Sequence, residues 1–207
     1  NISLFENVGD SLFLAVSPLL DDSSVAVYGG QIVIPAVADI NGDGWEDLFV
    51  GGVSGSVTYY RNLGLTDGLP VYHLETNSFE DILIVWVPGR DSRHGANALE
   101  FYDIDADEDL DLFWGDFYQP GLFFLENFGT PKDAIIPDSL MIDLYPQYDP
   151  VNTAGFNVPR LIDLNSDGEA ELFVGVQSGV YGTDYVDNFW YYELAGAGNF
   201  SLVTKNY

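Results

Sequence analysis

The feature that most constrains the fold is an acidic segment that occurs three times along the chain. Each copy places acidic or amide side chains at alternate positions and then runs into a short apolar stretch that ends in glycine. The copies begin at Asp39, Asp103 and Asp163, so their first aspartates are 64 and 60 residues apart. Self-similarity at such a period indicates a repeat architecture, in which each unit buries its apolar surface against its neighbours.

A second, aromatic motif follows each acidic segment. Its copies are Tyr59–Gly64, Phe124–Gly129 and Tyr191–Gly196, and a fourth copy, Leu4–Gly9, opens the chain. The C-terminal segment, in turn, resembles residues 71–77. The motifs therefore predict the tail of a preceding blade at 1–11, blade repeats at 12–64, 65–129 and 130–196, and the start of a following blade at 197–207.

The apolar runs between these motifs predict strands. They are rich in β-branched and aromatic residues and are bounded by Gly, Pro, Asn and Asp; examples are Asp47–Val50, Val57–Tyr60, Ile82–Val87 and Gly121–Leu125. No segment shows a convincing helical period. We therefore predict an all-β fold with about four antiparallel strands per unit, which is typical of β-propeller blades. A stacked solenoid and unrelated sandwiches are the alternatives.

The spacing of oxygen-bearing side chains in the acidic segments predicts metal sites. These side chains recur at positions 1, 3, 5 and 9, and position 7 can add a main-chain carbonyl as in the EF-hand loop. Ca²⁺ takes about six to eight oxygens, and a tight loop with alternate oxygens can wrap around one ion. The candidate ligands are Asp39, Asn41, Asp43, Trp45 and Asp47; Asp103, Asp105, Asp107, Asp109 and Asp111; and Asp163, Asn165, Asp167, Glu169 and Glu171. The expected cofactor is Ca²⁺, about three per chain; solvated acidic turns of a salt-adapted surface are the alternative.

The loops are not EF-hands, because position 12 lacks the bidentate Glu and a strand follows instead of a helix. Position 9 is expected to supply the closing carboxylate. Gly44 and Gly168 occupy position 6, where a sharp turn favours glycine. Glu108 takes this position in the second copy and resists a positive φ, which predicts a distorted or weaker loop there.

Taken together, the acidic and aromatic motifs resemble the FG-GAP/VCBS repeats of integrin-α-type β-propellers over essentially the whole chain. The resemblance implies one Ca²⁺ per loop, bound between strands of a blade. It also implies a mostly non-catalytic extracellular protein that serves adhesion, binding or surface assembly. The sequence departs from the family pattern at Glu108, at Glu171 and at Leu194, which stands where the other copies have Asn.

Charge and composition exclude several classes of function. There are 33 acidic and 6 basic residues, giving a net charge of −27, so nucleic acid and anionic membranes are poor partners. The chain has no cysteine, which excludes disulfides and thiolate chemistry, and no apolar run long enough to insert into a membrane. We expect an extracellular or cell-surface location. Sequons at Asn1 and Asn199 would permit glycosylation there.

The sequence offers little for catalysis, so we expect no enzyme. His73 lies in an apparent strand and is interpreted as structural, whereas Arg90, Arg93 and His94 share one loop. That loop is either a solvated turn or a ligand-binding loop for a carboxylate or an acidic sugar. A lectin-like protein, with loop tyrosines that stack on sugars, is one alternative function, and a non-catalytic part of a polysaccharide-degrading enzyme is another. The candidate tyrosines are Tyr118, Tyr145, Tyr148, Tyr181 and Tyr185.

The number of units raises the question of assembly. Closed propellers have about four to eight blades, so three units with partial units at both ends do not close a ring. Either the chain is a segment of a larger propeller, or its open edge strands pair with another copy. The second hypothesis predicts a head-to-tail oligomer or a filament.

Overall fold

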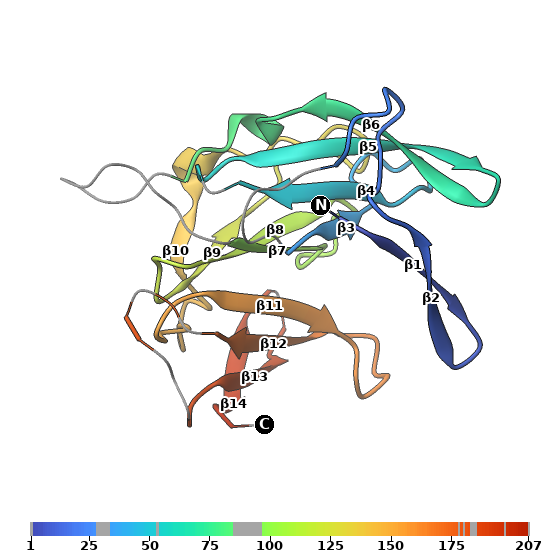
Figure 1. The fold of residues 1–207 in the computed structure, drawn as a ribbon. Coiled ribbons are helices and arrows are strands. Elements are labelled where there is room, and N and C mark those ends of the chain that lie inside the picture. The colour runs from blue at the N-terminus through green and yellow to red at the C-terminus, as the bar shows by residue number, and fades with distance from the viewer. Residues whose placement is uncertain are drawn as a thin grey trace.

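The computed structural model describes residues 2–27, 34–52, 54–84, 97–177, 179, 181–182, 186–196 and 198–206. Among these described residues, strands make up 49% and helix 3%, which confirms the predicted all-β class. The strands (Figure 1) are β1 (Leu4–Val8), β2 (Ser11–Val16), β3 (Ala36–Ala38), β4 (Asp47–Gly51), β5 (Val57–Thr66), β6 (Leu69–Thr76), β7 (Asn97–Tyr102), β8 (Asp111–Asp116), β9 (Leu122–Leu125), β10 (Ile142–Tyr145), β11 (Asn157–Ile162), β12 (Glu171–Val176), β13 (Phe189–Leu194) and β14 (Phe200–Thr204).

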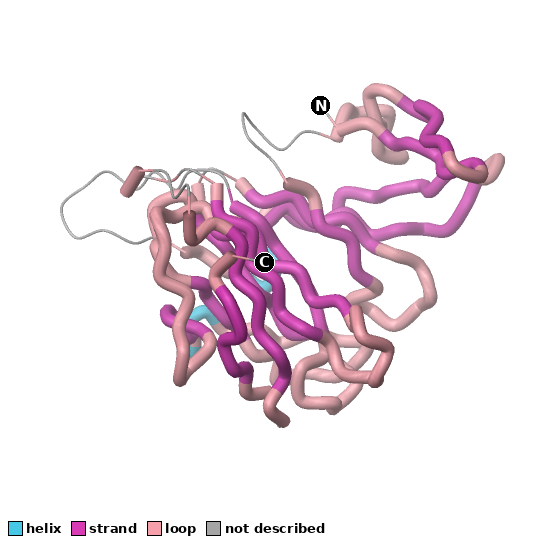
Figure 2. The backbone as a smooth tube through the Cα atoms, turned by 90° about the horizontal axis from the view of Figure 1, so that it is seen from below, coloured by secondary structure: helices cyan, strands magenta, loops and turns pink. Residues whose placement is uncertain are grey.

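Most strands form three antiparallel sheets of four strands each, as predicted for blade-type units. The first sheet has the order β3-β4-β5-β6, the second β7-β8-β9-β10 and the third β11-β12-β13-β14. The strands β1 and β2 form a separate N-terminal hairpin. Figure 1 shows the second sheet between the other two, and Figure 2 shows the strands of neighbouring sheets running side by side.

The sheets are offset by one strand from the predicted sequence units. Residues 65–129 hold β6, which completes the first sheet, and then β7, β8 and β9 of the second sheet. In the same way, residues 197–207, predicted to start a following blade, supply β14 as the fourth strand of the third sheet. Each unit therefore contributes its first strand to the sheet before it, because that strand pairs with the aromatic motif of the preceding unit.

The second strand of each sheet explains the apolar runs that follow the acidic loops. Along β8, Leu112 and Trp114 pack in the core shared with the first sheet, and Phe113 packs in the core shared with the third. Every residue of β4 and β8 is buried, so both faces of the runs Leu48–Val50 and Leu112–Trp114 are apolar. Burial of one such side chain stabilises the fold by about 1.5–3 kcal/mol.

Close contact between sheets depends on the glycine at the end of each apolar run. A Cβ on Gly51 would overlap the side chain of Asn97, the first residue of the next sheet. A Cβ on Gly115 would overlap the main-chain carbonyl of Asn157, the first residue of the third sheet. Gly175, the corresponding residue of the third sheet, has only the carbonyl oxygen of Val158 within reach, at 3.9 Å from an added Cβ.

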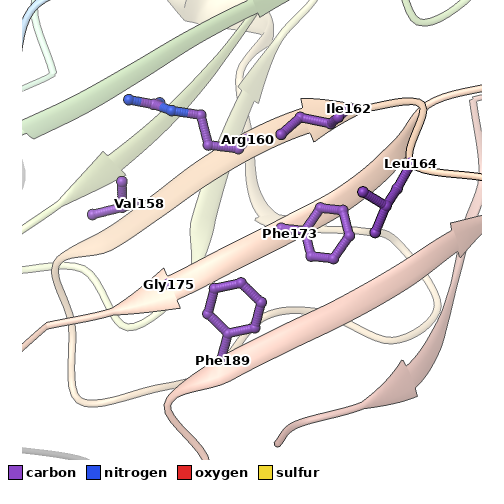
Figure 3. Close-up of a pocket in the computed structure, with 7 residues that line it drawn as sticks. All are labelled: Val158, Arg160, Ile162, Leu164, Phe173, Gly175 and Phe189. Atoms are coloured by element: carbon purple, nitrogen blue, oxygen red, sulfur yellow. The ribbon is translucent and has the colours of Figure 1, made fainter. Parts of the chain in front are cut away.

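The outer face of the third sheet carries an apolar pocket of about 370 Å³ (Figure 3). Phe173 corresponds to Phe49 and Phe113 of the first two sheets, and those two residues lie in the cores between sheets. The pocket is lined by Val158, Arg160, Ile162, Leu164, Phe173, Gly175 and Phe189. The pocket therefore lies on the face of the third sheet that corresponds to the covered faces of the first two. In those two sheets, the next sheet along the chain packs on this face.

Two short 3₁₀ turns lie outside the sheets, and the residues after the first of them were predicted as a strand. Ile82 and Ile84 are buried but belong to no strand; they follow a single 3₁₀ turn, Phe79–Asp81, and the rest of the run to Val87 lies outside the described residues. A second 3₁₀ turn is Asp138–Leu140. Within the described residues, no helix has the length and apolar character needed to cross a membrane.

Candidate metal centre

The three acidic loops share one backbone conformation. Each lies between the first and second strands of its sheet and places two residues, at positions 4 and 6, at positive φ. The φ values at position 6 are 89° for Gly44, 75° for Glu108 and 92° for Gly168. The prediction that Glu108 distorts the second loop is therefore wrong for the backbone, which keeps the left-handed conformation despite the Cβ.

Hydrogen bonds from the main chain to the first aspartate explain this shared conformation. Asp103 accepts from the N–H groups of Ala106 (2.8 Å), Asp107 (3.2 Å) and Glu108 (3.0 Å). Asp39 and Asp163 accept equivalent bonds from positions 5 and 6 of their own loops. The loop is thus wound around the carboxylate of position 1, and this set of bonds holds Glu108 at its unfavourable φ.

The carboxylate at position 9 is buried in all three loops, and in the first two it ties the loop to the asparagine of the aromatic motif. Asp47 accepts from the N–H of Asn62 (2.7 Å), from the Tyr59 hydroxyl (2.9 Å) and from the Asn41 amide (2.9 Å). Asp111 accepts from the N–H groups of Asn127 (2.8 Å) and Ile104 (3.2 Å).

Asn62 and Asn127 are residues of the candidate site that reasoning from the loops alone did not assign. The Asn62 side chain donates to the Glu46 carbonyl (2.9 Å), and that of Asn127 to the Leu110 carbonyl (3.2 Å). Each asparagine therefore bonds both the closing carboxylate and the carbonyl just before it. The signal in the sequence was the asparagine of the aromatic motif, at 15 and 16 residues after the closing aspartate.

The two departures from the family pattern in the third unit belong together. Glu171 accepts from the N–H of Leu164 (2.8 Å) and from the Asn165 amide (2.7 Å), both within its own loop. Leu194 stands where the other units have the asparagine. In the described structure Glu171 thus closes the third loop from inside, whereas Asp47 and Asp111 also accept from the N–H of Asn62 or Asn127.

The structure brings several predicted ligands together. Carboxylate oxygens of Asp103, Asp105 and Asp107 lie within 4.8 Å of one another, and so do those of Asp163, Asp167 and Glu171. Among the described residues, the carboxylates of the first loop do not form such a group; Asn41 bridges to Asp47 there. These two acidic groups could hold a metal ion, since carboxylate oxygens at this spacing suit a hard cation.

The residues predicted as ligands at position 7 differ in the burial and hydrogen bonding of their side chains. Asp109 is buried, and its Oδ1 has no hydrogen-bond partner among the described residues. An unpaired buried carboxylate oxygen is costly, so the donor set of the second loop fits a cation better than it fits water or protein alone. Trp45 and Glu169 donate their N–H groups to Asp43 and Asp167 (both 2.9 Å), and their side chains are exposed.

Crowding and burial raise the pKa of carboxyl groups in these loops. Burial raises the pKa of Asp111 to about 7 and that of Asp47 to about 6. Burial and the neighbouring Asp107 together raise the pKa of Asp109 to about 6. A bound divalent cation would favour the ionised form of each of these groups.

The remaining candidates fall elsewhere. Arg90, Arg93 and His94 lie outside the described residues, as does Tyr185. His73 lies in β6 and bonds through Nδ1 to Asp22 Oδ2 at 2.9 Å, which suits its structural interpretation. Tyr145 is not a loop residue: it ends β10, is buried, and donates its hydroxyl to the Gly198 carbonyl at 2.7 Å.

Replacing Glu108 with glycine is expected to stabilise the chain. A non-glycine residue at this φ costs about 1–2 kcal/mol, and glycine removes that cost while the bonds to Asp103 stay in place. Part of the gain is offset by the freedom that glycine adds to the unfolded chain, so we expect a net increase of about 1 kcal/mol in urea unfolding. Gly44→Ala is the matched test of the first loop, and should destabilise by a similar amount. Unchanged stability in both variants would contradict a conformational origin.

The metal-free chain is expected to lose stability as the pH rises from about 4 to about 7. The folded pKa of Asp111 lies above its ordinary value of 3.8, so over this window the unfolded state loses its proton while the folded state keeps it. The separation from 3.8 to about 7 corresponds to about 4 kcal/mol. Urea unfolding in chelator across this range measures the loss. Asp111→Asn should make the profile shallower and leave the slope that Asp47 and Asp109 contribute; a metal-free chain that gains stability over the same range would contradict the assignment.

Comparison with known proteins supports the repeat interpretation. Residues 39–114 match the family model of the FG-GAP-like repeat. This segment runs from the first acidic loop to Trp114 in β8 and so contains two of the three loops. No curated protein and no solved structure matches the chain. Residues 39–114 are therefore similar to an FG-GAP-like repeat, in keeping with the resemblance of the acidic and aromatic motifs.

Proposed function

We propose that this chain is a non-catalytic, calcium-stabilised scaffold of blade-type sheets that serves adhesion, binding or surface assembly outside the cell. The observation that carries the proposal is the threefold repetition of one loop. In each copy the same backbone turn is formed and a buried carboxylate at position 9 closes the loop, and in the second and third copies three carboxylates come together. FG-GAP-like repeats are generally non-enzymatic, in keeping with a structural role.

Calcium would act by completing the connection between the first two strands of each sheet. An ion in each loop neutralises carboxylates that otherwise repel one another across a few ångströms. In the first two sheets the closing aspartate also accepts from the N–H of the aromatic-motif asparagine, Asn62 or Asn127, so binding energy becomes folding energy. Three ions would change the net charge of −27 to about −21, which relieves repulsion across the whole chain.

An extracellular location suits the affinity expected of such loops. Extracellular calcium modules bind with Kd values of about 10⁻⁴–10⁻³ M, which matches millimolar external calcium. The acidic surface and the family match support the same location, since FG-GAP repeats are typically extracellular.

The test is the metal content of the chain and its calcium titration. We expect elemental analysis to find about three Ca²⁺ per chain. The double variant Asp103→Asn/Asp105→Asn should bind one ion fewer. Asp67→Asn, which removes an exposed acid in the turn between β5 and β6, is the control and should leave the count unchanged. Absence of bound calcium in the unsubstituted chain, or equal counts in all three proteins, would rule out the loops as calcium sites.

A carbohydrate-binding function is the second candidate, because two aromatic side chains are largely exposed. Tyr148 and Tyr181 are 76% and 63% exposed in separate loops, and exposed tyrosines can stack on sugar rings. A glycan array measures this directly: saturable binding that Tyr148→Ala or Tyr181→Ala abolishes would support it. The same array covers a role as the non-catalytic part of a polysaccharide-degrading enzyme, for which a plant or microbial polysaccharide should bind. A blank array would remove both.

A further inference from the structure

The first acidic loop contains the only Asn-Gly pair of the chain, Asn41–Gly42. Asparagine is a thermolabile residue, because its side chain can react with the main-chain nitrogen of the residue that follows. Glycine favours this reaction, since it has no Cβ to hinder the approach of that nitrogen. Packing requires the glycine here: a Cβ on Gly42 would lie 2.6 Å from the carbonyl oxygen of Pro131. The reactive pair is therefore part of the way the loop packs.

The main-chain nitrogen of Gly42 is open to solvent. Gly42 is exposed, and none of the described residues accepts a hydrogen bond from its N–H. At the same position of the second loop, the N–H of Ala106 donates to Asp103 at 2.8 Å. Gly44 follows an aspartate, but its N–H donates to Asp39 at 2.9 Å. Of these three nitrogens, only that of Gly42 is both preceded by an asparagine and without a hydrogen-bond acceptor.

The side-chain amide of Asn41 helps to close the first loop. It is half-buried and donates to Asp47 Oδ2 at 2.9 Å and to the Tyr59 hydroxyl at 3.5 Å. The amide thus links position 3 of the loop to the closing carboxylate at position 9. A carboxylate in the same place would lose this donor and repel Asp47. Loss of the amide nitrogen would therefore change what the loop needs in order to close.

We propose that Asn41 deamidates spontaneously and that the aspartate formed gives the first loop the acidic pattern of the second. Base removes the proton of the Gly42 N–H, and this nitrogen attacks Cγ of Asn41. The N–Cγ bond forms, the Cγ–Nδ2 bond breaks, and the amide nitrogen takes up a proton and leaves as ammonia. Water then opens the resulting cyclic imide. Opening at Cγ gives aspartate, and opening at the main-chain carbonyl carbon gives isoaspartate. One water is consumed for each ammonia released, and no oxidant takes part.

The aspartate product alters the ligand set of the first loop. Its carboxylates would stand at positions 1, 3 and 5, as do those of Asp103, Asp105 and Asp107, which lie within 4.8 Å of one another. The contact with Asp47 would change from a hydrogen bond to a repulsion, so the loop would close only around a cation. Isoaspartate instead lengthens the main chain and displaces the loop oxygens. This effect on calcium binding rests on the function proposed above, whereas the deamidation itself does not.

The first experiment follows deamidation of the full chain, incubated in chelator at a mildly alkaline pH. Peptide mapping by mass spectrometry should find deamidation about tenfold faster at Asn41 than at Asn165. Asn165 is a matched control within the chain, because it has the same loop position and also donates to the position 9 carboxylate, Glu171, at 2.7 Å. It precedes serine and is the more exposed of the two asparagines, so exposure alone would predict the opposite order.

A substitution in the third loop transfers the reactive pair. Ser166 has a φ of 64°, which suits glycine. Ser166→Gly should therefore keep the fold and make Asn165 react about tenfold faster.

The second experiment measures the effect of the product on calcium binding. Asn41→Asp should make the first loop bind calcium about tenfold more tightly in a titration, because ligand charge tunes the affinity of such loops. Asn41→Ser removes the amide donor without adding charge and is the control; it should not bind more tightly than the unsubstituted chain.

Three results would overturn the proposal. Deamidation at Asn41 that is no faster than at Asn165 would remove the site. A rate at Asn165 that Ser166→Gly leaves unchanged would show that glycine is not the cause. Equal calcium affinity in Asn41→Asp and the unsubstituted chain would remove the effect on the loop. Fragment masses report deamidation even if the loops bind no calcium, so failure of the proposed function and failure of the modification are distinguishable.

Discussion

Calcium at about 1 mM is expected to raise the free energy of unfolding of the metal-free chain by about 4 kcal/mol. This value follows from three sites with Kd of about 10⁻⁴ M, each of which contributes about 1.4 kcal/mol by mass action. For a chain of this length it corresponds to a rise in Tm of about 8–16 °C. The measurement is a thermal melt of the chelated chain before and after calcium is restored.

Two controls show whether the effect belongs to the loops. Magnesium at the same ionic strength should recover much less of the stability, because it demands tighter octahedral geometry. The double variant Asp103→Asn/Asp105→Asn should lose about a third of the calcium-dependent gain. Melting temperatures that chelator leaves unchanged would show that the acidic loops hold their turns through the hydrogen bonds to position 1 alone.

Alanine at position 115 is expected to be strongly destabilising, whereas alanine at position 175 is expected to be nearly neutral. The two glycines are the next-to-last residues of equivalent strands, β8 and β12. A Cβ at Gly115 overlaps the Asn157 carbonyl, which forces the second and third sheets apart, but a Cβ at Gly175 meets nothing closer than 3.9 Å. We expect a loss of about 3 kcal/mol or more for Gly115→Ala and less than about 0.5 kcal/mol for Gly175→Ala.

Urea unfolding of the two variants measures this difference, and Gly51→Ala is a further check. A Cβ at Gly51 meets the side chain of Asn97 and not its main chain. Because a side chain can move aside, the loss for Gly51→Ala should lie between the other two. Equal stabilities for Gly115→Ala and Gly175→Ala would mean that the sheets do not pack as closely as described.

The loops and strands could be predicted from the sequence because their signals are local. Four oxygens at fixed spacing, followed by a run such as Leu48–Val50, specify a turn and a strand within a dozen residues. The role of Asn62 could not be seen in the same way, because its partner Asp47 is brought close only by the pairing of β4 with β5. Tyr145 was misplaced for a related reason: a polar, Pro-containing stretch predicts a loop, but burial against Phe124 selects a strand.

Glu108 shows the opposite case, in which a correct local conformational preference is overridden by hydrogen bonds of the surrounding loop. The preference of glutamate for negative φ is real, yet the bonds that Asp103 accepts from the loop specify the turn more strongly. The offset between units and sheets could not be predicted from the sequence for a further reason. Periodicity fixes the length of a repeat but leaves open which strand belongs to which sheet.

That offset has a consequence for how such a chain can change its length. Every unit contributes its first strand to the sheet before it. An in-frame deletion of one unit therefore removes the fourth strand of that sheet, and the following unit supplies an equivalent strand. A duplicated unit is accommodated by the same exchange. Recombination between repeats can therefore lengthen or shorten the array without leaving a sheet short of a strand.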